Sequence, residues 1–176
     1  MTDLLFYRGD GLEFVGHIAN GKFVNTDTQN FTQGWSWIVV VGDQLLFYRI
    51  YDGLAAVGHI ANGKFVNTDT QNFTQRWSWI VVVGDQLLFH RESDSLAAVG
   101  HIANGKFVNT DTQNLTENQP PIVVVRDQLL FYRGNDGLAA IGHIANGKFV
   151  NTDTRNFPLD SSLENRRPEE FNNCDG

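Results

Sequence analysis

The sequence predicts an all-β protein built from four repeats of 42 residues, and three observations support this fold class. The segment GHIANGKFVNTDT occurs four times, and its histidine recurs every 42 residues as His17, His59, His101 and His143. Each repeat contains short runs rich in β-branched and aromatic residues, separated by Gly, Asp and Asn, and no window has helical periodicity. One unit of this size cannot bury its own apolar face, so the repeats are expected to stack and share a core.

The strands of one repeat can be followed through residues 35–74, where WSWIVVV, LLFYR, LAAVGHI and KFVNTDT alternate with tight turns. Residues 35–41 are apolar on both alternating faces apart from Ser36, which predicts the innermost strand. Residues 64–71 carry polar side chains on both faces, which suits a partly solvated outer edge. A meander that runs from buried to polar is typical of a propeller blade. We therefore predict a small β-propeller with repeats near residues 4–44, 45–86, 87–128 and 129–157.

The number of inner strands does not match the number of repeats. The run that begins with LLF starts four times, at Leu4, Leu45, Leu87 and Leu129, whereas the inner run occurs three times. The first or last blade is therefore predicted to be incomplete, and the charges and prolines of residues 158–176 predict a polar, disordered tail. Either the ring closes imperfectly, or a second chain or missing sequence completes it. Because an unpaired strand edge recruits partners, a homodimer with two-fold symmetry is our expectation.

Composition narrows the classes of partner. The chain has 176 residues, a net charge of −7 and scattered basic residues, which argues for one domain and against a nucleic-acid partner. No apolar run approaches the ~20 residues of a membrane span. The first residues lack the basic and apolar segments of a signal peptide, so a cytoplasmic location or non-classical export is expected. The single cysteine, Cys174, excludes an internal disulfide.

No pattern in the sequence predicts catalysis or a cofactor. Nothing resembles a nucleophile elbow, a phosphate loop or an HExxH motif. Asp43, Asp85 and Asp127 recur with the repeat, as turn residues do. An enzyme would more often show one asymmetric cluster set within the repeats. The chain is therefore predicted not to be an enzyme and to need no cofactor.

Two repeated sets of side chains were considered as metal ligands and set aside. The four repeated histidines fall on the third strand of each blade, roughly 10 Å outside the inner strand, so they cannot converge on a central ion. Asn67, Asp69 and Gln71 share one face of the outer strand, but a straight strand spaces such ligands about 7 Å apart. A solvated edge that discourages pairing between sheets is the expected role of this row. No metal site is predicted.

The connection from the outer strand to the next inner strand is the best candidate for a binding site. Meander geometry places it on the same rim as the turn between the second and third strands. This rim offers aromatic rings beside amide, hydroxyl and carboxylate groups, a mixture that binds sugars. The tryptophans could instead fill the space between blades. The predicted ligand-binding residues are Asn30, Thr32, Gln33, Trp35, Tyr51, Asp52, Asn72, Thr74, Gln75 and Trp77.

The stretch TQGWSWIVVVGDQLLFYR resembles the tachylectin-2-like lectin propellers. Gly34 and Trp35 match the GW of their repeats, Ile38 and Val39 match an Ile-Val pair, and residues 45–49 match LLFYR. The resemblance covers most of residues 4–157 at the level of pattern. It implies a non-enzymatic carbohydrate-binding module whose partners are glycans, of the N-acetylglucosamine type. The alternative is a protein-interaction or assembly scaffold without a sugar ligand.

The three junctions between blades differ from one another. Arg76 replaces the glycine of the GW pair in the second junction, and Gln119, Pro120 and Pro121 replace Trp-Ser-Trp in the third. The third junction is therefore not expected to bind what the first binds. We predict at most two sites of comparable strength, at residues 30–35 and 72–77, and none at residues 114–121.

Overall fold

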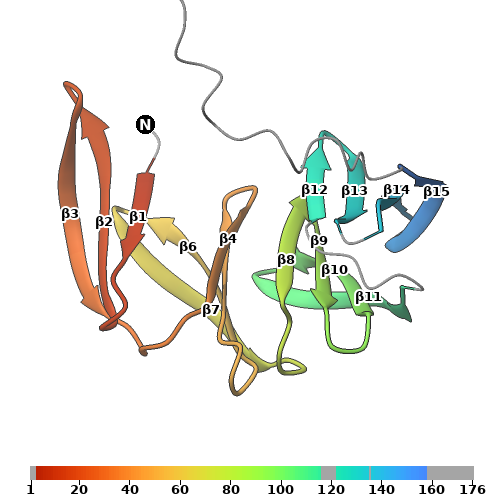
Figure 1. Ribbon diagram of the computed structural model, residues 1–176. Helices are drawn as coiled ribbons and strands as arrows, with labels where there is room; N and C mark the ends of the chain where they lie inside the picture. The colour runs from red at the N-terminus through yellow and green to blue at the C-terminus, as the bar shows by residue number, and fades with distance from the viewer. Residues whose placement is uncertain (1–2, 116–121, 135, 158–176) are drawn as a thin grey trace, which may run out of the picture.

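The computed structural model describes residues 3–115, 122–134 and 136–157, and its regular structure consists of four antiparallel sheets that follow one another along the chain (Figure 1). The first sheet contains β1 (Asp3–Tyr7), β2 (Leu12–Ala19) and β3 (Lys22–Asn30). The second contains β4 (Trp37–Val41), β5 (Gln44–Tyr48), β6 (Leu54–Ala61) and β7 (Lys64–Asn72). The third contains β8 (Trp79–Val83), β9 (Gln86–Arg91), β10 (Leu96–Ala103) and β11 (Lys106–Asn114). The fourth contains β12 (Ile122–Val125), β13 (Gln128–Arg133), β14 (Leu138–Ala145) and β15 (Lys148–Asn156).

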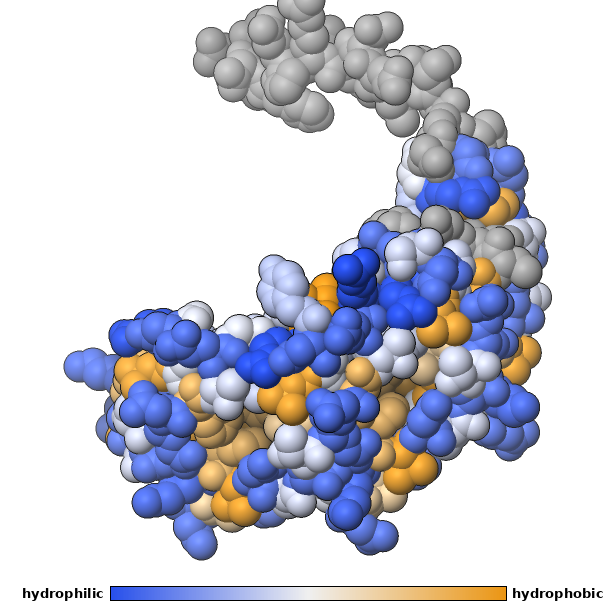
Figure 2. Space-filling model, turned by 90° about the horizontal axis from the view of Figure 1, so that it is seen from below, coloured by the Kyte–Doolittle hydropathy of each residue, from blue (hydrophilic) through white to orange (hydrophobic). Residues whose placement is uncertain are grey.

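The arrangement confirms the predicted fold class, a small propeller, and the incomplete blade, predicted to be the first or the last, is the first. Strand order within each four-stranded sheet follows the chain, from β4 to β7 for example. The inner strands β4, β8 and β12 contact one another, and so do the outer strands β7, β11 and β15. Among the described residues, the first sheet has three strands and no counterpart of β4. Seen from below, the described part of the molecule has a curved outline (Figure 2).

Two boundaries differ from the prediction. The inner strand of the second sheet begins at Trp37 rather than at residue 35. The Ser36 amide still donates to the Tyr48 carbonyl at 2.9 Å, and the Ser36 hydroxyl accepts a hydrogen bond from the Ile50 amide at 3.1 Å. The sheets also divide at the junctions, so each predicted repeat spans three strands of one sheet and the inner strand of the next. The tail predicted for residues 158–176 lies outside the described residues.

A β-bulge recurs where the last two strands of each sheet pair. In the second sheet, Gly58 lies opposite Asn67 and Val57 lies opposite Asp69, so Thr68 is the extra residue. A Cβ atom at Gly58 would lie 2.3 Å from Cζ of Phe65 and 2.4 Å from the Val66 carbonyl oxygen. Glycine is required here because the Phe65 ring lies directly across the strand.

The hydrophobic core lies between neighbouring sheets. The cluster between the first and second sheets is formed by Val15, Leu45, Phe47, Ala56 and Phe65. Similar clusters separate the second sheet from the third and the third from the fourth. Each sheet is therefore stabilised by its neighbours, as expected for repeats too small to enclose a core alone.

Polar contacts join each outer strand to the next sheet, and we call each set a latch. A latch consists of a threonine, an aspartate and a glutamine on the outer strand, which contact a glycine carbonyl, a lysine and a phenylalanine carbonyl of the next sheet. Between the second and third sheets, Thr68 Oγ1 donates to Gly105 O at 2.7 Å, Gln71 Nε2 donates to Phe107 O at 3.1 Å, and Lys106 Nζ lies 3.9 Å from Asp69 Oδ1. The same contacts recur at the two other interfaces.

The latches correct the role expected for the row of Asn67, Asp69 and Gln71. That row was predicted to be a solvated edge that discourages pairing between sheets. Asp69 and Gln71 instead hold the third sheet against the second, and Gln71 Nε2 also donates to Asp69 Oδ2 at 2.6 Å. Propeller stacking brings a carbonyl edge within reach of the outer strand, a contact that strand periodicity does not show.

Candidate functional site

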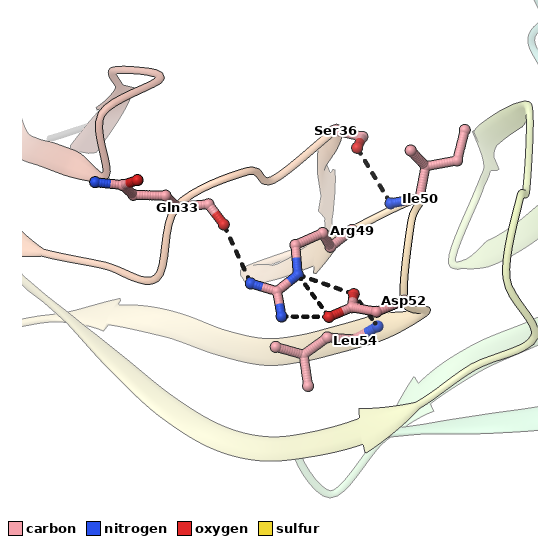
Figure 3. A network of polar contacts seen from close by, with 6 residues as sticks. All are labelled: Gln33, Ser36, Arg49, Ile50, Asp52 and Leu54. Atoms are coloured by element: carbon pink, nitrogen blue, oxygen red, sulfur yellow. Dashed lines mark hydrogen bonds and ion pairs between the residues drawn. The ribbon is translucent and has the colours of Figure 1, made fainter.

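The first junction, residues 31–36, lies beside the turn between β5 and β6, as predicted (Figure 3). The Arg49 guanidinium makes the connection. Its Nη1 donates to the Gln33 carbonyl at 3.1 Å, and its Nε donates to Asp52 Oδ1 at 2.8 Å. The hydrogen bond from Arg49 lowers the pKa of Asp52 to about 2, so this carboxylate is charged at neutral pH.

The second junction, residues 73–78, contacts the same turn from its other side. The Arg76 amide donates to the Ile50 carbonyl at 3.0 Å. The Tyr48 hydroxyl donates to the Thr74 carbonyl at 3.0 Å and accepts from the Trp77 amide at 3.2 Å. Tyr48 was not among the predicted site residues. Three of the four repeats have a tyrosine at this position of the LLFYR run, and this recurrence could have pointed to Tyr48.

A pocket of about 240 Å³ lies between the second and third sheets, below the second junction. Three predicted residues, Asn72, Thr74 and Trp77, line it. Asn72 and Thr74 are exposed, and neither side chain makes a hydrogen bond within the described part of the chain. The third sheet supplies lining residues that the prediction missed, namely Phe89, Leu96, Ala98, Phe107, Asn109 and Thr112.

The tryptophans of the two junctions are enclosed by protein. Trp77 is 4% exposed, its ring centroid lies 5.7 Å from that of Phe89, and Arg91 Cζ lies 5.6 Å from it. Trp35 is half-buried and packs in the same way, 5.6 Å from Phe47 and 5.8 Å from Arg49 Cζ. The rings thus fill the space between sheets, the second role considered for them. Stacking of a sugar on either ring would require the arginine to move away.

The remaining predicted residues lie on the rim outside this pocket. Tyr51 is 84% exposed, and Asp52 is engaged by Arg49. The Gln75 carbonyl accepts a hydrogen bond from Arg91 Nη1 at 3.2 Å, and Gln33 Nε2 donates to the Asp10 carbonyl at 2.9 Å. Their role in binding stays a prediction. The pocket brings together the side chains of Asn72, Thr74 and Trp77. Tyr51 and Asp52 of the turn do not line it.

The composition of the pocket is repeated at the first junction and altered at the third. Every residue that lines the pocket has an identical residue 42 positions earlier, so that Asn30, Thr32 and Trp35 correspond to Asn72, Thr74 and Trp77. At the third junction, Leu115 corresponds to Phe73 and Gln119 to Trp77. Residues 116–121 lie outside the described part of the chain, so the prediction that no site exists at residues 114–121 stays a prediction.

Two buried titratable residues, Glu13 and His90, were not among the predicted site residues. Glu13 is fully buried, and its carboxylate oxygens have no hydrogen-bond partner among the described residues. Burial, and secondarily the nearby Asp27, raises its pKa to about 7. His90 takes the place of Tyr48 in the third sheet, and burial lowers the pKa of its imidazole. At each of these positions the other three repeats share one residue type, alanine for Glu13 and tyrosine for His90. This departure from the repeat could have drawn attention to both residues. Neither lines the pocket.

The described residues contain no group of three or more His, Cys, Asp or Glu side chains arranged to hold a metal ion. In the same part of the chain, no helix could cross a membrane.

Comparisons with known proteins bear on the fold. No protein-family model and no curated protein matches the chain. A putative 6-phosphogluconolactonase from Bacteroides fragilis is similar in structure, with a TM-score of 0.60 and 12% identity over 84% of this chain and 49% of its own. The N-terminal domain of Nup159 is similar with a TM-score of 0.59 and 14% identity over 89% of this chain and 42% of its own.

A third similar structure is Saccharomyces cerevisiae Sqt1, with a TM-score of 0.59 and 10% identity over 84% of this chain and 43% of its own. The chain thus spans about half the length of the solved structures that it matches. At such identities the likeness shows the fold alone. The resemblance to tachylectin-2-like lectins is therefore shown as far as the β-propeller scaffold, and the chain is a β-propeller protein.

Proposed function

We propose that this chain is a non-enzymatic carbohydrate-binding module whose sites lie between neighbouring sheets. The observation that carries the proposal is the pocket between the second and third sheets. It combines the free amide of Asn72, the hydroxyls of Thr74 and Thr112, the amide of Asn109 and an aromatic wall. Sugars are bound by such mixtures, because their hydroxyls need hydrogen-bonding partners and their C–H faces need apolar contact.

The size of the pocket favours one sugar ring. Its volume of about 240 Å³ is below the ~300–1,000 Å³ typical of sites for drug-sized ligands. An N-acetylated amino sugar suits the lining, since its acetamido group offers a donor, an acceptor and a methyl group. Asn109 Nδ2 donates to Thr112 Oγ1 at 3.0 Å, so these two polar side chains lie side by side in the lining.

Weak sites of this kind act together. Because the first junction carries the identical set of residues, we expect at most two sites of comparable strength, at residues 30–35 and 72–77. Two sites on one rigid body raise the strength of binding to a surface with many glycans, although neither site alone is strong. Assembly without a sugar ligand is the second candidate, and the exposed end faces described below favour it.

A glycan array followed by titration calorimetry with N-acetylglucosamine tests the proposal. We expect two equal sites in the full chain. Asn30→Ala and Asn72→Ala should each remove one site or weaken it by about 1 kcal/mol or more, because each deletes an exposed amide without disturbing the core. Asn114→Ala, the matched change at the third junction, should leave both sites intact. Absence of glycan binding, or three equal sites, would contradict the proposal.

A further inference from the structure

The two ends of the curved row of sheets carry the two halves of the interface that joins every inner pair of sheets. Each inner interface has a donor face, which bears the threonine, aspartate and glutamine of the latch, and an acceptor face, which bears the glycine, lysine and phenylalanine. The fourth sheet presents a donor face with Thr152, Asp153 and Arg155. The first sheet presents an acceptor face with Gly21, Lys22 and Phe23. Within the described residues, neither face meets another sheet.

The latch groups of the donor face are only partly used. The single hydroxyl proton of Thr68 is shared between Val57 O in its own sheet, at 3.0 Å, and Gly105 O in the next sheet, at 2.7 Å. Its counterpart Thr152 bonds Ile141 O, in its own sheet, at 2.9 Å. Arg155 stands where the other outer strands have glutamine, and its Nε donates to Asp153 Oδ2 at 2.6 Å. Arg155 keeps further N–H groups that can reach a carbonyl as the glutamines do.

The two end faces also carry the aromatic rings that pack together at the inner interfaces. In the second sheet the Phe47 and Phe65 rings lie edge to face with centroids 5.1 Å apart. Phe31, which follows β3, packs against both rings, with its centroid 5.5 Å from that of Phe47 and 5.0 Å from that of Phe65. The first sheet repeats the pair as Phe6 and Phe23, 4.9 Å apart but 52% and 37% exposed.

The first sheet has no third ring that packs on Phe6 and Phe23 as Phe31 packs on Phe47 and Phe65 among the described residues, but a ring of this kind, Phe157, lies at the other end of the described chain. Phe157 follows β15 as Phe31 follows β3, and its amide donates to Gly137 O at 2.8 Å as the Phe31 amide donates to Gly11 O at 2.7 Å. Phe157 is 53% exposed. Ile141, on the same donor face, is 38% exposed, whereas its counterpart Val57 is 2% exposed.

We propose that the donor face of one copy of the chain binds the acceptor face of a second copy. Phe157 then inserts beside Phe6 and Phe23 of the other copy. The latch is completed by Thr152 to the Gly21 carbonyl, Arg155 to the Phe23 carbonyl and Asp153 to Lys22. The threonine and aspartate contacts reproduce contacts that occur three times within the chain. The phenylalanine contact reproduces one that occurs twice, and Arg155 takes the place of the glutamines of the inner latches.

The contact joins unlike faces, so it forms either a closed ring or an open filament. This chain aligns with 49% and 42% of the lengths of two propeller proteins that it resembles. Two copies therefore supply about one full circle of sheets, which favours a ring of two chains with two identical junctions. This ring keeps the two-fold symmetry expected from the sequence, but the contacts lie on the end faces and not along the unpaired inner edge of β1.

Size-exclusion chromatography with light scattering on the full chain tests the proposal. The wild type should have twice the 19.8 kDa mass of one chain. Phe23→Asp and Phe157→Asp, which damage opposite faces, should each weaken self-association at least about tenfold, because each buries a charge in an apolar contact. Mixing the two variants should restore a dimer, since one undamaged junction remains between them. Tyr51→Asp, at an exposed aromatic residue on neither face, should leave the dimer unchanged.

Ile18→Glu is the second acceptor-face variant, because Ile18 is 52% exposed and its replacement spares the ring pair. Thermal unfolding followed by circular dichroism shows whether each variant is folded. A wild type that stays monomeric at about 100 μM overturns the proposal, as does a mixture of the two face variants that does not associate. Filaments of the wild type overturn the closed ring.

Discussion

The first and second sheets have nearly the same sequence but place the same side chains in opposite surroundings. Phe47 is fully buried, whereas Phe6 in the equivalent LLFY run is 52% exposed. Phe65 and Phe23 differ in the same direction, at 7% and 37%. The second sheet lies between two others, and the first has a neighbour on one side among the described residues. Burial in this molecule is thus a property of the interface between repeats and not of the repeat itself.

The first sheet also differs from the second in a buried residue, because Glu13 stands where the second sheet has Ala55. Ala55 of the second sheet is 1% exposed within a hydrophobic cluster, and the equivalent residue of the first sheet is Glu13. The interface that buries a methyl group in one sheet buries a carboxyl group in the other. Because this group lacks a hydrogen-bond partner among the described residues, we expect the first sheet to be the less stable of the two.

The largest test of the comparison removes the equivalent phenylalanine from each sheet. Phe47→Ala should lower the free energy of unfolding by about 3–5 kcal/mol, because it leaves a cavity in a closed core. Phe6→Ala should lower it by about 1 kcal/mol, since half of that side chain already contacts water. Urea denaturation measures both, at protein concentrations where light scattering gives the monomer mass. Equal losses would show that the two sheets are equally enclosed.

The buried carboxyl group gives a pH-dependent test. The pKa of Glu13 is raised to about 7 in the folded state from an ordinary value of 4.5, so the folded protein holds this proton more tightly. The stability that depends on the neutral carboxyl is therefore present below pH 4.5 and is lost as pH rises through 7. Glu13→Gln should raise the free energy of unfolding by roughly 2–3 kcal/mol at pH 8 and change it little at pH 4.

The control for that change is the matched substitution Ala55→Gln in the second sheet. It introduces an amide where the native residue is small and buried, so it should destabilise at every pH. Denaturation curves of wild type and variants across pH 4–8 give both results. A pH profile of Glu13→Gln that parallels the wild type would contradict the assignment of the titration to Glu13.

The smallest expected effect compares the first and second junctions. Gly34 has a φ of 86°, and Arg76 at the equivalent place has a φ of 66°, which is unfavourable for a residue with a Cβ atom. Arg76→Gly should raise the free energy of unfolding by about 0.5–1 kcal/mol, the relief being partly offset by the greater freedom of glycine in the unfolded chain. Gly34→Arg, the reverse exchange, should destabilise. Thermal denaturation compares the two, and a loss of stability in Arg76→Gly would disprove the strain.

Much of the fold and part of the site could be predicted because they depend on local patterns. The spacing of 42 fixed the repeat, and alternation separated inner from outer strands. The count of inner runs showed that the first or last blade lacks a strand, and the structure assigns this to the first sheet. The rim shared by a junction and a turn followed from meander connectivity. The pocket was only half predicted, since Asn109 and Thr112 come from the next sheet, far from Asn72 in sequence.

The sequence by itself determined what each repeat becomes, because strand pairing within a blade is encoded by neighbouring residues and short turns. Tertiary structure decided what each copy of a residue does. Stacking enclosed Trp77 between Phe89 and Arg91, and it turned the polar row of Asp69 and Gln71 into a latch. Stacking also left Phe6 and Phe157 exposed at opposite ends while their counterparts inside are covered. Identical residues differ in this way because burial and hydrogen bonding depend on which sheet lies alongside, and a single repeat carries no record of its neighbours.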